Sequence, residues 1–194
     1  MSNYRRACIT GSTVFFTVNS HQRRPIFVEP SFRFALRSAF QQTRFEFPFK
    51  INALVLLPDH LHCIWTLPNE DNNIPIRWSM IKRLVTKQIG AQYILNNSLS
   101  PSRKKRNEST IWQRRYWEHH ILSEADYTSH LNYCYRNPVK HGLVNSVKDW
   151  KYSTFHRDVK YGLYPKDWCS NEQLVGKSNF GESVREAHPI GISD

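Results

Sequence analysis

Two apolar segments separated by only two turn-forming residues constrain the fold of this chain more than any other feature. Residues 49–57 and 60–67 are rich in β-branched and aromatic side chains, and Pro58-Asp59 between them is typical of a tight turn. A connection this short cannot join parallel strands, so the two segments are predicted to form an antiparallel hairpin. Any fold of the chain must contain this hairpin within one sheet.

The segments around the hairpin predict an α+β fold. Further strands are expected at residues 12–18 and 111–121, and amphipathic helices from Pro30, over residues 74–95, and after Ser123. The resulting order is β-α-β-β-α-β-α. Its first six elements are those of a ferredoxin-like split βαβ sandwich, in which one antiparallel sheet is backed by two helices.

The seventh element is an added C-terminal helix. Ser123 is expected to cap its start, and Pro138 with Gly142 is expected to end it near Asn137. Residues 1–168 are predicted to form one domain, onto which the aromatic side chains after Gly142 pack. Residues 169–194 contain few apolar side chains and are expected to form a flexible tail.

The excess of basic side chains indicates a polyanionic partner. The chain has 27 Lys and Arg against 16 Asp and Glu, a net charge of +11. Residues 1–169 carry 25 basic and 12 acidic side chains, whereas residues 170–194 carry 2 and 4. A folded part this basic favours nucleic acid as the partner, although charge alone fits a merely soluble basic protein equally well.

The cysteines and the lack of long apolar segments indicate the compartment. Cys8, Cys63, Cys134 and Cys169 lie far apart without a C-x-x-C pair, which argues against a zinc knuckle or a disulfide scaffold. No run of about 18 apolar residues could span a bilayer, and the N-terminus lacks the apolar stretch of a signal peptide. We therefore expect a cytoplasmic, nucleoid-associated protein with reduced thiols and no membrane partner.

His60 and His62 are predicted to share one face of a strand. Side chains alternate along a strand, so Leu61, Cys63 and Trp65 take the opposite face. Same-face neighbours lie about 6.6 Å apart, which lets two imidazoles converge on one cation. Taken alone, such a pair is more often two histidines on a half-exposed strand, so a metal site needs further support.

The last predicted helix supplies a nucleophile and a third ligand. Apolar side chains at i, i+4 and i+7 predict its buried stripe: Tyr127, Leu131 and Cys134. Tyr133 and Asn137 lie one turn apart on a different stripe, so Tyr133 is predicted to project away from the packing face. The Asn137 amide oxygen is a ligand that a hard cation accepts. Tyr135, at the edge of the apolar stripe, is the alternative nucleophile.

Together these side chains suggest transesterification at phosphorus. A divalent cation held by His60, His62 and Asn137 would neutralise the charge that develops on the phosphate and on the leaving 3′ oxygen. Tyr133 would attack the phosphorus, which gives a phosphotyrosine linkage to the DNA 5′ end and a free 3′-OH. One phosphodiester replaces another, so no nucleotide cofactor is needed, and the sequence has neither a P-loop nor a G-x-G-x-x-G segment.

Several segments match, in order, the motifs of one known family. His60-Leu61-His62, within residues 57–65, and residues 133–142 are similar to its HUH motif and its nucleophile helix. Other similar segments are Tyr4-Arg5-Arg6, Trp112, residues 115–119, residues 150–158 and residues 162–168. Over residues 4–168 the sequence thus resembles the single-tyrosine HUH transposases, and most closely the REP-associated tyrosine transposases.

The resemblance implies a ferredoxin-like fold, dependence on Mg²⁺ or Mn²⁺, and cleavage of single-stranded DNA beside hairpin-forming repetitive extragenic palindromes of bacterial chromosomes. It also implies that Tyr133 rather than Tyr135 is the nucleophile. The chain departs from many insertion-sequence relatives at Asn137, because these carry Gln four residues after the tyrosine. The shorter side chain changes the reach of the predicted third ligand.

Basic clusters among aromatic side chains indicate the DNA contacts. Arg5, Arg6, Arg114 and Arg115 are predicted to bind DNA phosphates. Three nearby aromatic side chains are candidates for stacking on unpaired bases: Trp112, Tyr116 and Trp117. The basic loop at residues 96–110 is long for a compact domain, which is typical of a functional segment.

Two other functions stay open from the residues. An HUH nickase of replication or conjugation is usually a larger, multi-domain chain. A non-catalytic module that binds single strands on the same sheet would not need both histidines together with Tyr133 and Asn137. The sequence does not decide between a monomer and a homodimer.

Overall fold

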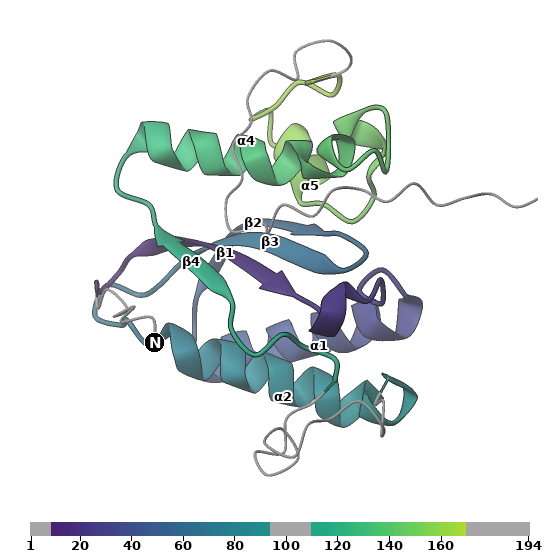
Figure 1. Cartoon of the computed structure of the whole chain (residues 1–194). Helices are drawn as coiled ribbons and strands as arrows, with labels where there is room; N and C mark the ends of the chain where they lie inside the picture. The colour runs from purple at the N-terminus through teal and green to yellow at the C-terminus, as the bar shows by residue number, and fades with distance from the viewer. Residues whose placement is uncertain (1–8, 94–109, 170–194) are drawn as a thin grey trace, which may run out of the picture.

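A four-stranded antiparallel sheet organises the chain in the computed structural model, which describes residues 9–93 and 110–169 (Figure 1). The strands are β1 (Thr13–Asn19), β2 (Lys50–Leu56), β3 (His60–Thr66) and β4 (Trp117–His120), in the order β2-β3-β1-β4. β2 and β3 form the predicted hairpin, and β1 pairs with both β3 and β4. The predicted α+β, ferredoxin-like arrangement is therefore confirmed. Arg5, Arg6, nearly all of the 96–110 loop and the predicted tail after Cys169 lie outside the described residues.

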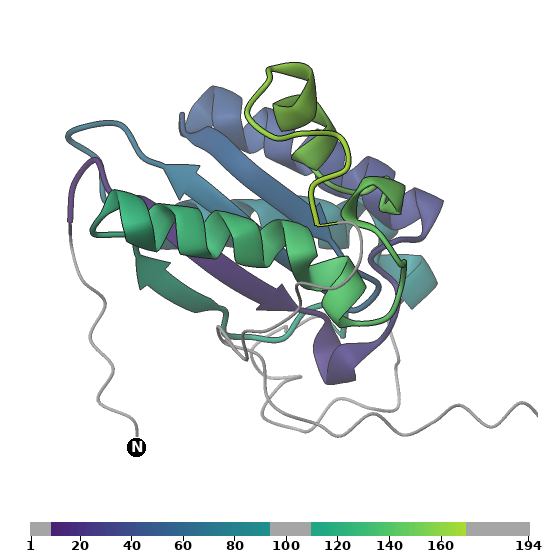
Figure 2. The same ribbon diagram turned by 90° about the horizontal axis from the view of Figure 1, so that it is seen from above.

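Helices cover both faces of the sheet. α1 (Pro30–Glu46) and α2 (Ile74–Tyr93) lie side by side on one face, as the sequence predicts. α4 (Glu124–Lys140) and the short α5 (Phe155–Lys160) lie on the other, with α4 running across the strands (Figures 1 and 2). Two 3-10 helices, η1 (His21–Arg23) and η2 (Val147–Asp149), complete the described structure. Within these residues no helix combines the length and the apolar character needed to cross a bilayer.

Strand alternation divides the interior into two cores. Phe16, Cys63 and Trp65 belong to the core beneath α1 and α2, where Trp65 stacks on Trp78 with ring centroids 4.4 Å apart. Phe15 and Ile64 belong to the core beneath α4. The second core also takes in the aromatic side chains after Gly142, which confirms their predicted return to the domain: Trp150, Phe155, Tyr164 and Trp168.

The fourth strand is shorter than predicted. Only residues 117–120 pair continuously with β1, whereas Trp112 makes an isolated bridge to Ser20. Lys82 Nζ donates to the carbonyl oxygens of Gln113 and, at 3.4 Å, of Arg114. Ile111 and Gln113 still exchange backbone hydrogen bonds with His21 and Asn19, but the next carbonyls accept from the Lys82 side chain, and residues 113–116 do not continue the pairing.

α4 continues past the proline that was expected to end it. Pro138 lies inside the last turn, and the helix ends at Lys140. The carbonyls of Asn137 and Pro138 accept from the backbone amides of His141 and Leu143 at 3.0 and 2.9 Å, so the turn stays bonded although proline lacks a donor. Gly142, with φ of 65°, ends the helix instead. The extra turn brings Lys140 and His141 to the site described next.

Candidate functional site

His60 and His62 lie together on the face of the sheet that α4 covers. Their ring centroids are 4.9 Å apart, and they are 1% and 0% exposed. The shared face was predicted from strand alternation and is confirmed. The alternative, two histidines on a half-exposed strand, does not apply, because α4 lies over this face and both side chains are buried.

Each imidazole is oriented through its Nδ1 atom. His60 Nδ1 is 2.7 Å from Asp59 Oδ1, and His62 Nδ1 is 2.9 Å from Thr17 Oγ1. Thr17 faces His62 because the two residues are paired in the register of β1 and β3. With both Nδ1 atoms engaged in this way, Nε2 is the nitrogen that each ring would present to a cation. A polar group that fixes the second nitrogen is typical of histidines that bind metals.

Asp59 is itself held in place. Arg23 Nε lies 2.8 Å from Asp59 Oδ2, while Asp59 Oδ1 contacts His60. Burial raises the pKa of Asp59, but the hydrogen bond with His60 and the charges of His60 and Arg23 outweigh this effect. The pKa therefore lies below its usual range, and Asp59 stays ionised beside His60. Neither Asp59 nor Thr17 was among the predicted site residues.

The predicted orientation of α4 is wrong in one respect. Tyr133 does not project away from the packing face but faces the sheet and is 9% exposed. Of the predicted buried stripe, Cys134 is fully buried, whereas Tyr127 and Leu131 are only partly buried. Tyr127 and Leu131 line a hollow of about 840 Å³ with Tyr164 and other residues. The helix is thus covered on two sides, and Tyr133 lies on the side toward the strands.

Tyr133 lies against the histidines and a lysine. Its ring centroid is 5.2 Å from that of His62 and 6.0 Å from that of Phe15. Lys140 Nζ is 3.4 Å from the Tyr133 hydroxyl oxygen and 4.9 Å from the centroid of its ring. A positive charge at this place stabilises negative charge on the phenol oxygen. Lys140 was missed because the helix was expected to end before it.

Two residues near the end of α4 are candidates for the third metal ligand. Asn137 is completely buried one turn after Tyr133. His141 is exposed, and its ring centroid lies 5.2 Å from that of His60. His141 was not predicted, since it too lies beyond the expected end of the helix.

Tyr135, the alternative nucleophile, points into a different environment. Its hydroxyl donates to the buried carboxylate of Asp158 on α5, and its ring packs edge-on against Phe155 and Tyr164. Burial and this hydrogen bond to Asp158 raise the pKa of Tyr135. The structure therefore separates the two tyrosines, with Tyr133 beside the histidines and Tyr135 in the packing of the C-terminal segment.

The predicted DNA contacts are only partly described. Arg114 and Arg115 are exposed just before β4, next to Lys82. Trp112 is 4% exposed and belongs to the first core, so its expected role in base stacking is wrong. Trp117 is 37% exposed and keeps that potential.

Comparison with known proteins gives a consistent result. No family model matches the sequence. A REP-associated tyrosine transposase of Escherichia coli strain K12 is 45% identical over 171 residues, which are 88% of this chain and 93% of the relative. A Haemophilus influenzae protein assigned provisionally to the same family is 44% identical over 92% of this chain and 99% of its own length. A solved structure of a REP-associated tyrosine transposase bound to a REP hairpin superposes with a TM-score of 0.80 at 44% identity, over 96% of this chain and 100% of that one.

Proposed function

Because the chain belongs to the REP-associated tyrosine transposases, we propose that it cuts and rejoins single-stranded DNA beside REP-type hairpins with Tyr133 as its nucleophile. The observation that carries this assignment is the position of the Tyr133 side chain between His62 and Lys140. The name of the E. coli relative and the hairpin bound in the similar structure support the reaction and the substrate.

Tyr133 would act by nucleophilic substitution at phosphorus. Its hydroxyl oxygen forms a bond to the phosphorus as the bond to the 3′ oxygen breaks, so the DNA 5′ end becomes linked to the protein. The phenol gives its proton to solvent, and the departing 3′ oxygen takes one up from solvent, so no net proton is gained or lost. Lys140, 3.4 Å from the attacking oxygen, stabilises the charge that the oxygen carries before it attacks.

His60 and His62 fit a divalent cation such as Mg²⁺ or Mn²⁺. Asp59 and Thr17 orient the two rings through Nδ1, and each ring would coordinate the ion through Nε2. Asn137 is proposed as the third ligand, with His141 as its rival because of its contact with His60. When bound, such an ion supplies charge neutralisation at the scissile phosphate and at the leaving oxygen.

The remaining contacts with DNA are proposed to come from basic side chains. Arg114 and Arg115 are exposed on the segment that leads into β4, where they would hold phosphates. Arg5 and Arg6 are proposed for the same role from the sequence. Trp117, partly exposed at the start of β4, is suited to stacking on an unpaired base.

The assignment is tested by trapping the covalent intermediate. The full chain is incubated with Mn²⁺ and a 3′-end-labelled REP hairpin with single-stranded flanks, and labelled protein is scored on a denaturing gel. Tyr133→Phe should fold normally and give no labelled protein, whereas the matched Tyr135→Phe variant should still give it. Adduct formation by Tyr133→Phe but not by Tyr135→Phe would show that the nucleophile is misassigned. No adduct with any variant, including the unmodified chain, would favour a non-catalytic binding protein.

The third ligand is tested in the same assay. Asn137→Ala and His141→Ala are compared over a range of Mn²⁺ concentrations. The variant that lacks the true ligand should need more Mn²⁺ for half-maximal adduct formation, while the other should keep the normal requirement. An unchanged requirement in Asn137→Ala would remove Asn137 from the proposed site.

A further inference from the structure

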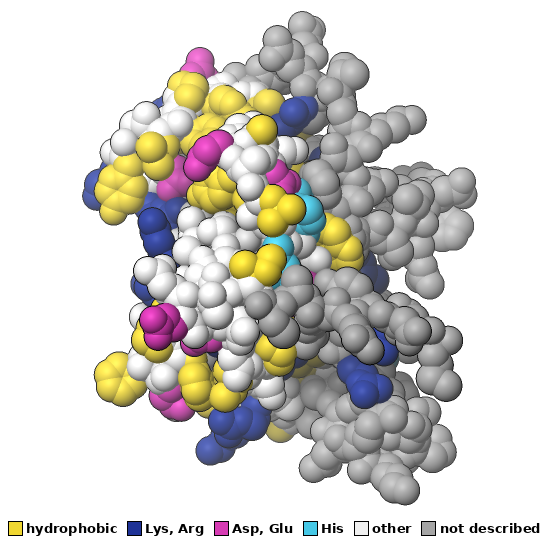
Figure 3. Space-filling view, turned by 90° about the vertical axis from the view of Figure 1, so that its left-hand side faces the viewer, with side chains coloured by type: hydrophobic (Ala, Val, Ile, Leu, Met, Phe, Trp, Pro, Cys, Tyr) yellow, Lys and Arg dark blue, Asp and Glu magenta, His cyan; other side chains and the backbone are white. Residues whose placement is uncertain are grey.

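A second group of metal-binding side chains lies outside the site described above. His119 on β4 and Asp126 and His130 on α4 each offer one ligand atom, and these atoms all lie within 4.8 Å of one another. Histidine side chains reach the surface on the side of the molecule where β4 and the start of α4 lie, next to acidic and hydrophobic groups (Figure 3). The side chains of His119 and His130 are 36% and 3% exposed, so the group extends from the surface into the interior.

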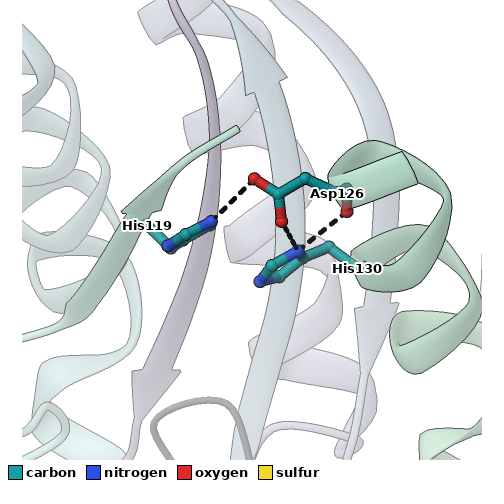
Figure 4. Close-up of side chains that lie close together, drawn as sticks. All are labelled: His119, Asp126 and His130. Atoms are coloured by element: carbon teal, nitrogen blue, oxygen red, sulfur yellow. Dashed lines mark hydrogen bonds and ion pairs between the residues drawn. The ribbon is translucent and has the colours of Figure 1, made fainter. Parts of the chain in front are cut away.

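Asp126 connects the two imidazoles (Figure 4). Its Oδ2 atom is 2.9 Å from His119 Nε2, and its Oδ1 atom is 2.9 Å from His130 Nδ1. Asp126 and His130 are four residues apart, so α4 presents both on one face. His130 Nδ1 also contacts the backbone carbonyl of Asp126 at 2.9 Å. A bond of one ring nitrogen to a backbone carbonyl fixes the ring, and it is a common arrangement in histidines that bind metals.

The chemistry of the three side chains suits a cation. One carboxylate and two imidazoles supply an oxygen and two nitrogen ligand atoms that lie within 4.8 Å of one another. A carboxylate together with two imidazoles is a ligand set that suits Zn²⁺ and similar transition-metal ions.

We propose that His119, Asp126 and His130 bind a divalent transition-metal ion of the Zn²⁺ type, at a site separate from His60 and His62. The rings of His119 and His130 stack at 4.5 Å with 13° between their planes. Since nitrogen lone pairs lie in the ring plane, binding requires one ring to tilt, and the partly exposed His119 has room to do so. Three protein ligands would leave a fourth position for water on the exposed side.

The role of this ion would be structural. It would join β4 to the first two turns of α4, the helix that carries Tyr133. Phe15 contacts both His130 and Tyr133, with ring centroids 4.9 and 6.0 Å away, and so lies between the second site and the nucleophile. The ion would thus hold the helix in register over the sheet without touching the DNA phosphate.

Metal-stripped full-length protein is titrated with Co²⁺, whose visible absorption reports its ligands. The His60→Ala/His62→Ala double variant should still bind one Co²⁺, because the second site is intact. Adding His119→Ala to that variant should weaken Co²⁺ binding by more than about 100-fold. Removing a residue that only hydrogen-bonds to a metal ligand can already cost about that factor, and His119 would be a ligand itself. Asp126→Asn, which keeps the side-chain shape, should weaken it in the same way. His120→Ala, on the opposite face of β4, is the matched control and should not.

Thermal unfolding gives a second readout. At about 100 times its Kd, Zn²⁺ should raise the Tm of the His60→Ala/His62→Ala variant by roughly 5–10 °C, and it should do so much less once His119→Ala is added. The proposal is wrong if the double variant binds no Co²⁺, or if His119→Ala and Asp126→Asn leave both affinity and the rise in Tm unchanged. Adduct formation with the REP hairpin is measured separately, so the proposed function can fail or hold independently of this result.

Discussion

Removal of the Lys140 charge should slow formation of the covalent adduct. Lys140 Nζ lies 3.4 Å from the Tyr133 hydroxyl oxygen. At that separation the attraction between unit charges is about 1 kcal/mol at the dielectric constant of water and about 5 kcal/mol at an effective value of 20. Because Lys140 is exposed, solvent screens the pair and the lower part of this range applies, roughly 1–2 kcal/mol. Lys140→Met should therefore reduce the rate about 5–30-fold.

The assay must separate this effect from weaker DNA binding. Single-turnover rates of adduct formation are measured with the protein in large excess over the labelled hairpin, at concentrations above the Kd of each variant. Lys140→Arg keeps the charge and should retain most of the rate. Lys160→Met removes an exposed lysine on α5 and controls for the loss of net charge.

The following outcomes would contradict a role for the Lys140 charge in adduct formation. If Lys140→Met reacts at the normal rate once all DNA is bound, the lysine does not stabilise the attacking oxygen. If Lys140→Arg is as slow as Lys140→Met, the amine acts by its shape or its hydrogen bond and not by its charge. Equal slowing by Lys160→Met would assign the effect to overall charge.

Three further predictions concern DNA binding and stability. Hydrogen bonding to the buried Arg77 holds the pKa of Asp71 below its usual value. This pair therefore stabilises the fold above about pH 4, and the stabilisation is lost as the pH falls through the lowered pKa. The free energy of unfolding of Asp71→Asn should consequently fall less on acidification than that of the unmodified chain. Arg114→Ala/Arg115→Ala should make the slope of log affinity against log salt shallower by about 1.4 for single-stranded DNA, and an unchanged slope in a salt titration would exclude both phosphate contacts. Tyr135→Phe removes a hydroxyl bonded to a buried carboxylate and should cost about 1.5–3 kcal/mol in urea unfolding while adduct formation persists.

The two strands of the hairpin were predictable because their periodicity leaves little choice. A side chain on a strand can point to only two faces, so His60 and His62 had to share one whatever the rest of the fold. The pairing of Thr17 with His62 was not predictable. It depends on the register of β1 and β3, two strands that lie more than 40 residues apart in sequence.

The helix that carries Tyr133 was predicted less well. An apolar stripe identifies one packing face, but α4 packs against both the sheet and the C-terminal segment. The stripe of Tyr127 and Leu131 indicated only the second of these, so Tyr133 was placed on the wrong side. Pro138 does not end the helix as predicted, because a proline in the last turn removes only one hydrogen-bond donor.

The residues after Pro138 form the solvent-exposed edge of the site. His60, His62 and Asn137 are buried, and Tyr133 is nearly so, whereas Lys140 and His141 at the end of α4 are exposed. Lys140 contacts Tyr133 and His141 contacts His60, so each of these exposed residues touches one part of the buried site. An anionic phosphodiester that approaches from this end meets a positive charge before it meets the tyrosine. Residues 138–142 therefore supply the exposed edge of the buried site, including its positive charge, as well as the end of the helix.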